Sequence, residues 1–179
     1  MRKHISYLFI TLGVFFLVYG SYLFYLRYSP NKLSFTSYIP DNSTQVATDA
    51  QPIELNIPDL NINTSITSST IKNDIWETSS TGVSYLNLSP VPGEKGNSIL
   101  YGHNWTSTLG NLYKIKPGET IQITYADNST KNFVVEYTSV VTPDETDIIE
   151  QTSDTRLTIY TCTGFLDSKR FVVVAKLQS

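Results

Sequence analysis

Residues 156–177 read RLTIYTCTGFLDSKRFVVVAKL, two runs rich in aliphatic and aromatic side chains on either side of a short loop. Such runs are typical of β-strands when residues such as Gly, Asp and Ser separate them. We therefore expect strands over residues 156–161 and 170–177. If these strands pair antiparallel, Cys162 and Arg170 stand at the two mouths of the loop and can face one groove.

Most of the remaining chain beyond residue 51 also reads as short strands. Apolar residues alternate with polar ones, the period of a strand with one buried face, and clusters of Pro, Gly and Asn mark turns. Residues 72–79 are expected to form a weak helix or turn, and residues 109–116 a short helical turn. About eight short strands without a long soluble helix predict an all-β barrel or sandwich. The six further strands are expected over residues 52–57, 59–66, 82–88, 98–103, 119–125 and 131–141.

The chemistry available to this part of the chain is narrow. Beyond residue 32 the sequence holds one histidine, His103, one cysteine, Cys162, and two arginines, Arg156 and Arg170. A thiol attacks an acyl group as the thiolate, so a catalytic cysteine needs a base or a cation beside it. Taken singly, a lone cysteine is often a small buried hydrophobe, and a lone histidine is often structural. The choice between these interpretations depends on the flanking sequence.

The flanking sequence matches a known pattern in three places. Residues 96–103 read GNSILYGH, residues 158–162 read TIYTC, and Arg170 precedes the apolar run FVVV. In order and spacing these segments resemble the G-N-x-x-x-x-G-H motif, the T-L-x-T-C motif and the following arginine of the sortases. Ile159 stands where the second motif has leucine, which exchanges one aliphatic side chain for another. The resemblance covers roughly residues 53–177, whereas Arg156 matches no motif and is expected to be a surface charge.

The resemblance implies a closed eight-stranded sortase-like β-barrel with short helices and a catalytic set of His103, Cys162 and Arg170. In the implied reaction the Cys162 thiolate attacks the threonine carbonyl of a sorting signal similar to L-P-x-T-G and forms a thioester. His103 protonates the leaving amine and later activates the acceptor amine. Arg170 binds the substrate backbone and the developing oxyanion. The implied partners are surface proteins that carry the signal and an amine acceptor, either a cell-wall precursor or a pilin lysine.

The sortases that build pili carry a lid with a D-P-aromatic triplet. The nearest sequence here is Asp74-Ile75-Trp76, which departs from the triplet in its middle residue and in its position. The resemblance therefore favours a class D- or E-like sortase over the lid-bearing pilus class. Some sortases bind calcium with acids like those of residues 144–150, but such runs are usually solvated, so no metal and no cofactor is assigned.

Two other classes of function stay open at this point. The chain could be a membrane-tethered β-barrel that binds peptides or wall polymer without turning them over, with Cys162 as a structural thiol. It could also be a hydrolytic cysteine protease that uses water as the acceptor. The papain-type signature is absent, and His103 precedes Cys162 in the chain. The joint match of histidine, cysteine and arginine disfavours the first alternative, and only an assay with acceptor amines separates transfer from hydrolysis.

A membrane anchor is expected at the N-terminus. Residues 5–26 hold no charged side chain, about 20 such residues span a hydrocarbon core, and no small-residue cleavage pattern follows. We expect a cytoplasmic tip and single-pass anchor over residues 1–32, a flexible polar linker over residues 33–51, and the catalytic barrel over residues 52–179. A flexible linker means that few contacts should cross between anchor and barrel. A cleaved signal is the alternative. Basic residues flank both ends of the apolar segment, and the resemblance implies an extracytoplasmic barrel.

Charge divides along the chain. Residues 1–32 contain basic residues and no acid, so all 16 acidic residues lie in the remainder, which is net negative. That balance argues against a nucleic-acid partner. A single cysteine also excludes an intramolecular disulfide, so an external domain would carry a free thiol.

Overall fold

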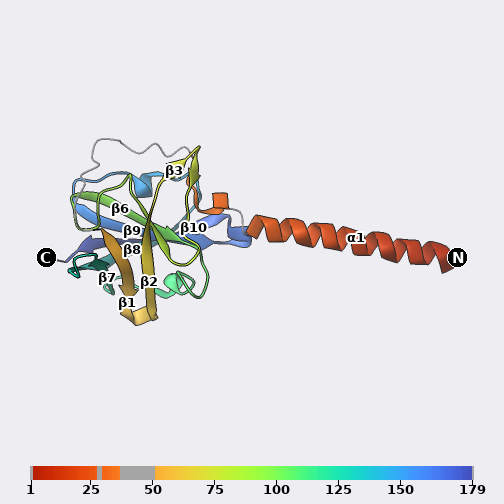
Figure 1. The fold of residues 1–179 in the computed structure, drawn as a ribbon, viewed down its shortest axis with the longest axis horizontal. Coiled ribbons are helices and arrows are strands. Elements are labelled where there is room, and N and C mark those ends of the chain that lie inside the picture. The colour runs from red at the N-terminus through yellow and green to blue at the C-terminus, as the bar shows by residue number, and fades with distance from the viewer. Residues whose placement is uncertain (1, 28–29, 37–50, 179) are drawn as a thin grey trace.

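The computed structural model describes residues 2–27, 30–36 and 51–178. The first range is the helix α1 (Arg2–Arg27), and the second contains the short 3-10 helix η1 (Pro30–Leu33). α1 projects from one end of a β-barrel, so the N-terminus lies far from the rest of the chain (Figure 1).

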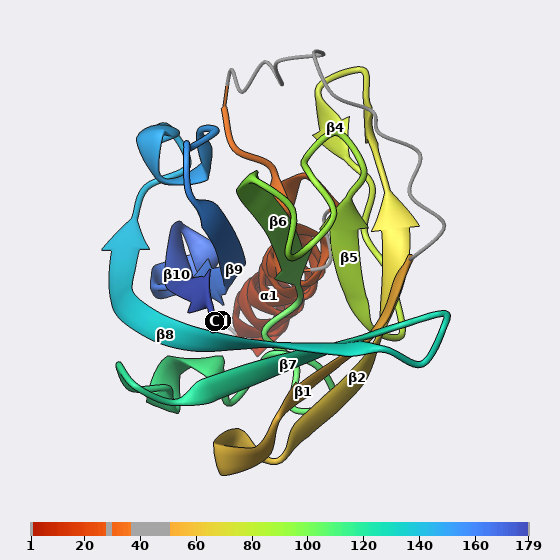
Figure 2. The same cartoon turned by 90° about the vertical axis from the view of Figure 1, so that its left-hand side faces the viewer.

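Eight strands of the described chain close into a barrel in the order β1-β2-β5-β6-β9-β10-β8-β7. Figure 2 shows this barrel from the end opposite α1. Neighbouring strands pair antiparallel except for β2 with β5 and β6 with β9, which are parallel. The expected closed eight-stranded all-β barrel is confirmed. The strands are β1 (Pro52–Ile57), β2 (Ile62–Ser69), β5 (Val83–Leu86), β6 (Gly96–Gly102), β7 (Thr120–Tyr125), β8 (Thr130–Val141), β9 (Thr155–Thr163) and β10 (Lys169–Leu177).

The segment expected as a weak helix or turn over residues 72–79 contains the turn but no helix. β3 (Ile71–Lys72) and β4 (Ile75–Trp76) form a two-stranded sheet. Asn73 and Asp74, between them, have φ values of 50° and 61°. Two consecutive residues with positive φ make the turn that suits the twist of a hairpin, and Asn and Asp adopt it more easily than other non-glycine residues. The helix alternative was therefore wrong because this turn chemistry overrides it.

The other connections contain single turns of 3-10 helix. The helical turn expected over residues 109–116 is η3. The acidic residues 144–150 lie in the connection before β9, which contains η4. The short helices are η2 (Pro58–Leu60), η3 (Leu112–Lys114), η4 (Asp147–Ile149) and η5 (Phe165–Asp167).

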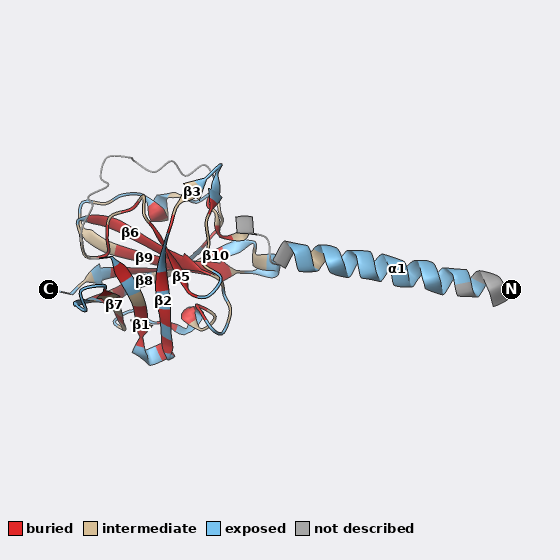
Figure 3. Ribbon diagram, in the orientation of Figure 1, coloured by how far each residue is buried: buried red, intermediate tan, exposed pale blue. Residues whose placement is uncertain are grey.

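The core consists of two clusters of buried side chains, one inside the barrel and one on the outer face of its wall. Side chains alternate between the two faces of a strand. On β9, Leu157 and Ile159 belong to the inner cluster, while Tyr160 and Cys162 belong to the outer cluster. β6, β9 and β10 are therefore buried over most of their length, as the red strands in Figure 3 show. This double burial explains why their sequences are continuously apolar and not alternating.

Part of the expected linker packs on the barrel. We call residues 30–36 the covering segment. Its Leu33 and Phe35 are 0% and 3% exposed and belong to the outer cluster. The Phe35 ring lies edge-on to that of Tyr160, with 5.0 Å between centroids. The expectation of few contacts between anchor and barrel is therefore wrong at the covering segment, because Leu33 and Phe35, two positions apart, both pack into the outer cluster. Residues 37–50 lie outside the described residues, and the division into three domains stays a proposal.

α1 has the composition of a membrane-spanning helix. Among the described residues it contains one candidate span, Tyr7–Tyr25, with 19 residues, a mean hydropathy of 1.8 and no burial inside the structure. Figure 3 shows the helix exposed along its length, in contrast to the barrel. A rise of 1.5 Å per residue gives this span a length of about 28 Å, close to the thickness of a hydrocarbon core.

Candidate active site

Cys162 and Arg170 face each other across two paired strands. β9 and β10 pair antiparallel over their full length, and the register places Arg170 directly opposite Cys162. The structure therefore has the pairing that the sequence analysis assumed. On β10, Val172 and Val174 belong to the same outer cluster as Cys162, so the alternation of side chains puts Arg170 on that outer face as well. Both residues are nearly covered, at 5% and 3% exposure.

His103 arrives from a third strand. β6 runs parallel to β9, and the last pair in their register is Gly102 with Thr161. The Thr161 hydroxyl reinforces this end by donating to the Gly102 carbonyl at 2.8 Å. His103 is the next residue of the chain, as Cys162 is the next residue of β9, so the histidine leaves its strand beside the cysteine. The structure thus brings together all three residues that the sequence singled out.

The Gly96-Asn97 start of the histidine motif fixes this register. Asn97 is buried; its amide donates to the carbonyls of Ile148 and Glu150, and its oxygen accepts from the Thr158 hydroxyl at 2.7 Å. Gly96 has φ 116°, and a Cβ there would lie 2.7 Å from a Gln151 side-chain oxygen. These contacts lock β6 against β9 and the loop before it. The motif residues far from the chemistry therefore set where His103 emerges.

The His103 ring is held by its own loop. It stacks on Trp105 with 4.2 Å between ring centroids and 7° between planes, and its carbonyl accepts from the Thr108 hydroxyl at 2.6 Å. Burial lowers the pKa of His103, an effect that the nearby Asp167 carboxylate opposes. Trp105 was not predicted as a site residue. The only indication in the sequence is that an aromatic residue follows His103 by two positions.

Cys162 is protonated in this conformation. Its thiol donates to the Lys32 carbonyl of the covering segment at 3.1 Å. Burial raises the pKa of Cys162 to about 11, although the positive charges of Arg170 and Lys32 lower it. A thiol in this state is a poor nucleophile. The arrangement therefore holds Cys162 in place with its thiol in the less reactive, protonated form.

Arg170 is a buried cation held by carbonyl oxygens. It donates to the carbonyls of Asp167 and Lys169 at 3.1 and 3.0 Å, and to the Ser34 carbonyl of the covering segment at 3.1 Å. Its Nε is buried and has no partner among the described residues. A simple ion pair with Asp167 is not what holds it, because that carboxylate contacts Lys32 at 4.0 Å and the Asn104 amide at 3.1 Å. The Nε of the guanidinium is therefore still available as a donor.

The covering segment packs against Cys162 and Arg170. We call the surface beneath this segment the groove. The Tyr160 hydroxyl donates to the Leu33 carbonyl at 2.8 Å, and the Thr36 amide donates to the Pro143 carbonyl at 2.7 Å. Together with the bonds from Cys162 and Arg170, these contacts bind the backbone of the covering segment at the end of η1 and just after it. Sequence analysis missed this role, and the available signal was the alternation of Leu33 and Phe35 in a polar stretch.

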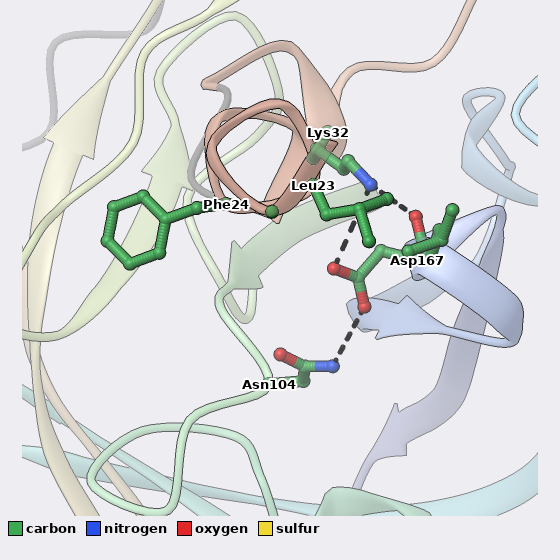
Figure 4. Close-up of a pocket in the computed structure, with 7 residues that line it drawn as sticks. Leu23, Phe24, Lys32, Asn104 and Asp167 are labelled. Carbon is green, nitrogen blue, oxygen red and sulfur yellow. Dashed lines mark hydrogen bonds and ion pairs between the residues drawn. The ribbon is translucent and has the colours of Figure 1, made fainter. Parts of the chain in front are cut away.

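A cavity of about 540 Å³ opens beside the groove, between α1 and the loop that joins β9 to β10. Figure 4 shows Lys32 and Asn104 converging on the Asp167 carboxylate in its wall, with Leu23 and Phe24 of the helix opposite. Among the described residues, no group of three or more His, Cys, Asp or Glu side chains is placed to hold a metal ion. In the acidic loop, the Glu145 carboxylate accepts from the amide and hydroxyl of Thr142.

Comparison with known proteins agrees with this arrangement. Residues 55–178 match the family described as the sortase domain. The chain belongs to the sortase family. This membership, which the sequence motifs had indicated, is confirmed over most of the chain.

Two curated sortases are similar in sequence. Sortase A of Listeria monocytogenes is 34% identical over 88 residues, which are 47% of this chain and 39% of that protein. Sortase A of Bacillus anthracis is 32% identical over 87 residues, which are 46% of this chain and 41% of that protein. The match thus spans about two-fifths of the length of these sortases.

Solved sortase structures are similar in fold. The Listeria monocytogenes sortase A structure has a TM-score of 0.59 at 27% identity, covering 73% of this chain and 89% of that one. Sortase C of Clostridium perfringens gives 0.60 at 22% identity, covering 72% and 71%. A lid mutant of Corynebacterium diphtheriae sortase A gives 0.63 at 20% identity, covering 91% and 95%. Sortases of different types match equally well, so the class D- or E-like assignment stays a hypothesis.

Proposed function

We propose that this sortase is a membrane-anchored cysteine transpeptidase. Its substrates are surface proteins with a C-terminal signal similar to L-P-x-T-G, and its acceptor is an amine on a cell-wall precursor or a pilin lysine. α1 holds it in the membrane as a single-pass protein with the barrel outside. The observation that carries the proposal is the opposition of Cys162 and Arg170 on paired strands, with His103 leaving a third strand beside them.

The first half of the reaction cleaves the substrate. The Cys162 thiolate attacks the threonine carbonyl carbon, a C–S bond forms, and negative charge moves to the carbonyl oxygen. Arg170 donates hydrogen bonds to this oxyanion, a contribution of about 3–4 kcal/mol for one donor in other enzymes. His103 as imidazolium gives its proton to the leaving nitrogen as the C–N bond breaks. The products are a thioester on Cys162 and the released C-terminal peptide.

The second half transfers the acyl group. The acceptor amine attacks the thioester carbonyl while the now neutral His103 takes a proton from it. The C–S bond breaks, a new amide bond forms, and the Cys162 thiolate and the His103 imidazolium are restored. Water in place of the amine would give hydrolysis by the same steps. The nature of the acceptor therefore distinguishes a transpeptidase from a protease.

The contacts of the covering segment support recognition of a peptide backbone. The Lys32 carbonyl accepts from the Cys162 thiol, and the Ser34 carbonyl accepts from Arg170. A sorting signal on the same path would offer carbonyl oxygens to the same two donors. It follows that the covering segment has to leave the groove before a substrate enters. Its departure would also expose Cys162 to water, which removes the main cause of its high pKa.

The proposal is tested with the full chain in detergent and a library of fluorogenic sorting peptides, with and without amine acceptors. We expect cleavage of peptides similar to L-P-x-T-G, and a transfer product of the right mass when an amine is present. A covalent adduct on Cys162, trapped with a vinyl sulfone, should appear once per chain because the sequence has one cysteine.

Two results would contradict this function. Water as the acceptor under every condition would make the chain a hydrolytic cysteine protease. Peptide binding without turnover, unchanged by Cys162→Ala, would make it a binding module with a structural thiol.

A further inference from the structure

The loop between β9 and β10 places two apolar side chains at its surface. Phe165 and Leu166 belong to η5 and are 85% and 42% exposed. Leu166 and Asp167 have φ values of 51° and 61°, a left-handed backbone that turns the loop outward. Two neighbouring apolar side chains exposed together form a patch, and exposed apolar patches can mark contacts with a membrane or a partner.

The same loop lies against the membrane helix. α1 contacts η5, and Gly20 and Leu23 of the helix line one cavity together with Leu166 and Asp167 of the loop. The candidate span ends at Tyr25. At 1.5 Å per residue, Gly20 lies about 8 Å before that end along the helix axis.

The loop therefore lies at the level of the last turns of the span, where hydrocarbon meets the headgroup layer. Headgroup layers are about 5–8 Å thick on each side of the core. Aromatic and aliphatic side chains are stable at this depth.

The polar groups of this region are mutually satisfied. Lys32 donates to the Leu166 carbonyl and lies 4.0 Å from the Asp167 carboxylate, which also accepts from the Asn104 amide (Figure 4). Pairing lowers the cost of bringing these groups close to lipid. The loop thus has an apolar tip, and the charged groups behind this tip are paired with one another. This arrangement suits a segment that inserts into a membrane surface.

We propose that the β9–β10 loop inserts Phe165 and Leu166 into the headgroup layer of the bilayer that α1 spans. The proposal rests on the membrane anchor of the proposed function. It adds a second point of attachment, and it fixes the orientation of the barrel. Cys162 lies one residue before the end of β9, the strand that enters this loop. The catalytic groove is therefore held at the membrane surface, where peptides leaving the bilayer first become accessible.

The test uses full-length protein in vesicles of phosphatidylcholine with a minority of phosphatidylglycerol. Phe165→Trp places a fluorescent reporter at the loop tip, and Ile53→Trp is the matched control. Ile53 is 42% exposed on β1, which lies across the barrel from β9 in the strand order. Lipids brominated near the headgroup quench indoles at the membrane surface. After subtraction of the two native tryptophans, we expect the Phe165→Trp reporter to be quenched at least about twice as strongly as the control, as interfacial depth requires.

Flotation of the same vesicles distinguishes a failure of the loop insertion from a failure of the membrane anchor. Protein that fails to float after carbonate treatment would contradict the anchor itself. Protein that floats but shows equal quenching for both reporters overturns only the loop insertion, and leaves Phe165 exposed to water or to the substrate. Stronger quenching by lipids brominated near the chain ends would also overturn it, because that depth is the bilayer centre and not the headgroup layer.

Discussion

The inner and outer clusters of the core differ in what completes them. Every member of the inner cluster comes from the barrel and its loops, residues 55–177. The outer cluster contains Cys162 and is completed by Leu33 and Phe35, which come from the covering segment next to α1. The barrel thus closes its interior by itself but needs a distant segment to cover the face that carries Cys162. Substitutions on the inner face of a strand should therefore change stability, and substitutions on the outer face of the same strand should change activity.

The largest expected effect separates the two faces of β9. Cys162→Ala, on the outer face, should lower kcat/KM at least about a thousandfold, because nothing else can form the thioester, while the melting temperature changes little. Ile159→Ala, on the inner face, should lower the free energy of unfolding by about 2–5 kcal/mol and leave the folded fraction active. Peptide cleavage and urea unfolding measure both. Turnover by Cys162→Ala, or inactivity of folded Ile159→Ala, would contradict the assignment of activity to the outer face and of stability to the inner face.

The next effect concerns the two arginines of the β9–β10 pair. Arg170→Lys should lower kcat/KM about a hundredfold, since lysine keeps the charge but loses the fork of donors that reaches several oxygens. Arg156→Lys is the control, because Arg156 lies 2.9 Å from the Asp154 carboxylate and should keep full activity. Equal losses in the two variants would show that the effect is general to basic residues and not specific to the groove.

The third effect is on stability at high pH. Burial raises the pKa of Cys162 from 9.0 to about 11, so the folded state favours the neutral thiol. The resulting stability is complete below pH 9, falls as the unfolded thiol ionises, and is lost above pH 11. Relative to Cys162→Ala, the wild type should lose about 2 kcal/mol across this window. Urea unfolding of both proteins at several pH values removes the contribution of other groups, and a constant difference would contradict the burial of the thiol.

The smallest effect tests the covering segment. Leu33→Ser should weaken its binding to the outer cluster and raise the rate of Cys162 alkylation by a neutral reagent about tenfold, which corresponds to 1.4 kcal/mol of easier opening. Ile53→Ser, a change at a half-exposed site on β1, should leave the rate unchanged. Alkylation at the wild-type rate in Leu33→Ser would show that the segment does not control access to the thiol.

Sequence patterns predicted the barrel strands well. Strands alternate or are continuously apolar according to the burial of their faces, so seven of the eight barrel strands were expected within two residues of where they lie. The strand expected over residues 59–66 is the exception, because its first residues form η2 and β2 covers Ile62–Ser69. The three site residues were also expected together, because His103 and Cys162 stand at strand ends and Arg170 at a strand start within matched motifs. Their catalytic roles stay proposals that the variants above test.

The outer cluster was only partly predictable. Leu33 and Phe35 lie in a segment whose polar composition is typical of a linker, and composition does not report that two alternating side chains fit a preformed surface. The stacking of Trp105 on His103 also depends on loop geometry that no periodicity encodes. Local patterns indicate which residues are buried in regular strands, whereas contacts between distant irregular segments follow from the finished shape.

The register between β9 and β10 constrains the strand residues near Cys162 and Arg170 but not the loop residues between them. Because side chains alternate on a strand, a shift of β10 by one residue would turn Arg170 toward the barrel interior and move every inner residue outward. An insertion within either strand is thus forbidden. Residues 164–168 are different, because a loop can lengthen at little entropic cost while its ends stay fixed. New sequence could therefore be grafted into that loop to alter what the enzyme contacts, while the strand register still holds Cys162 opposite Arg170.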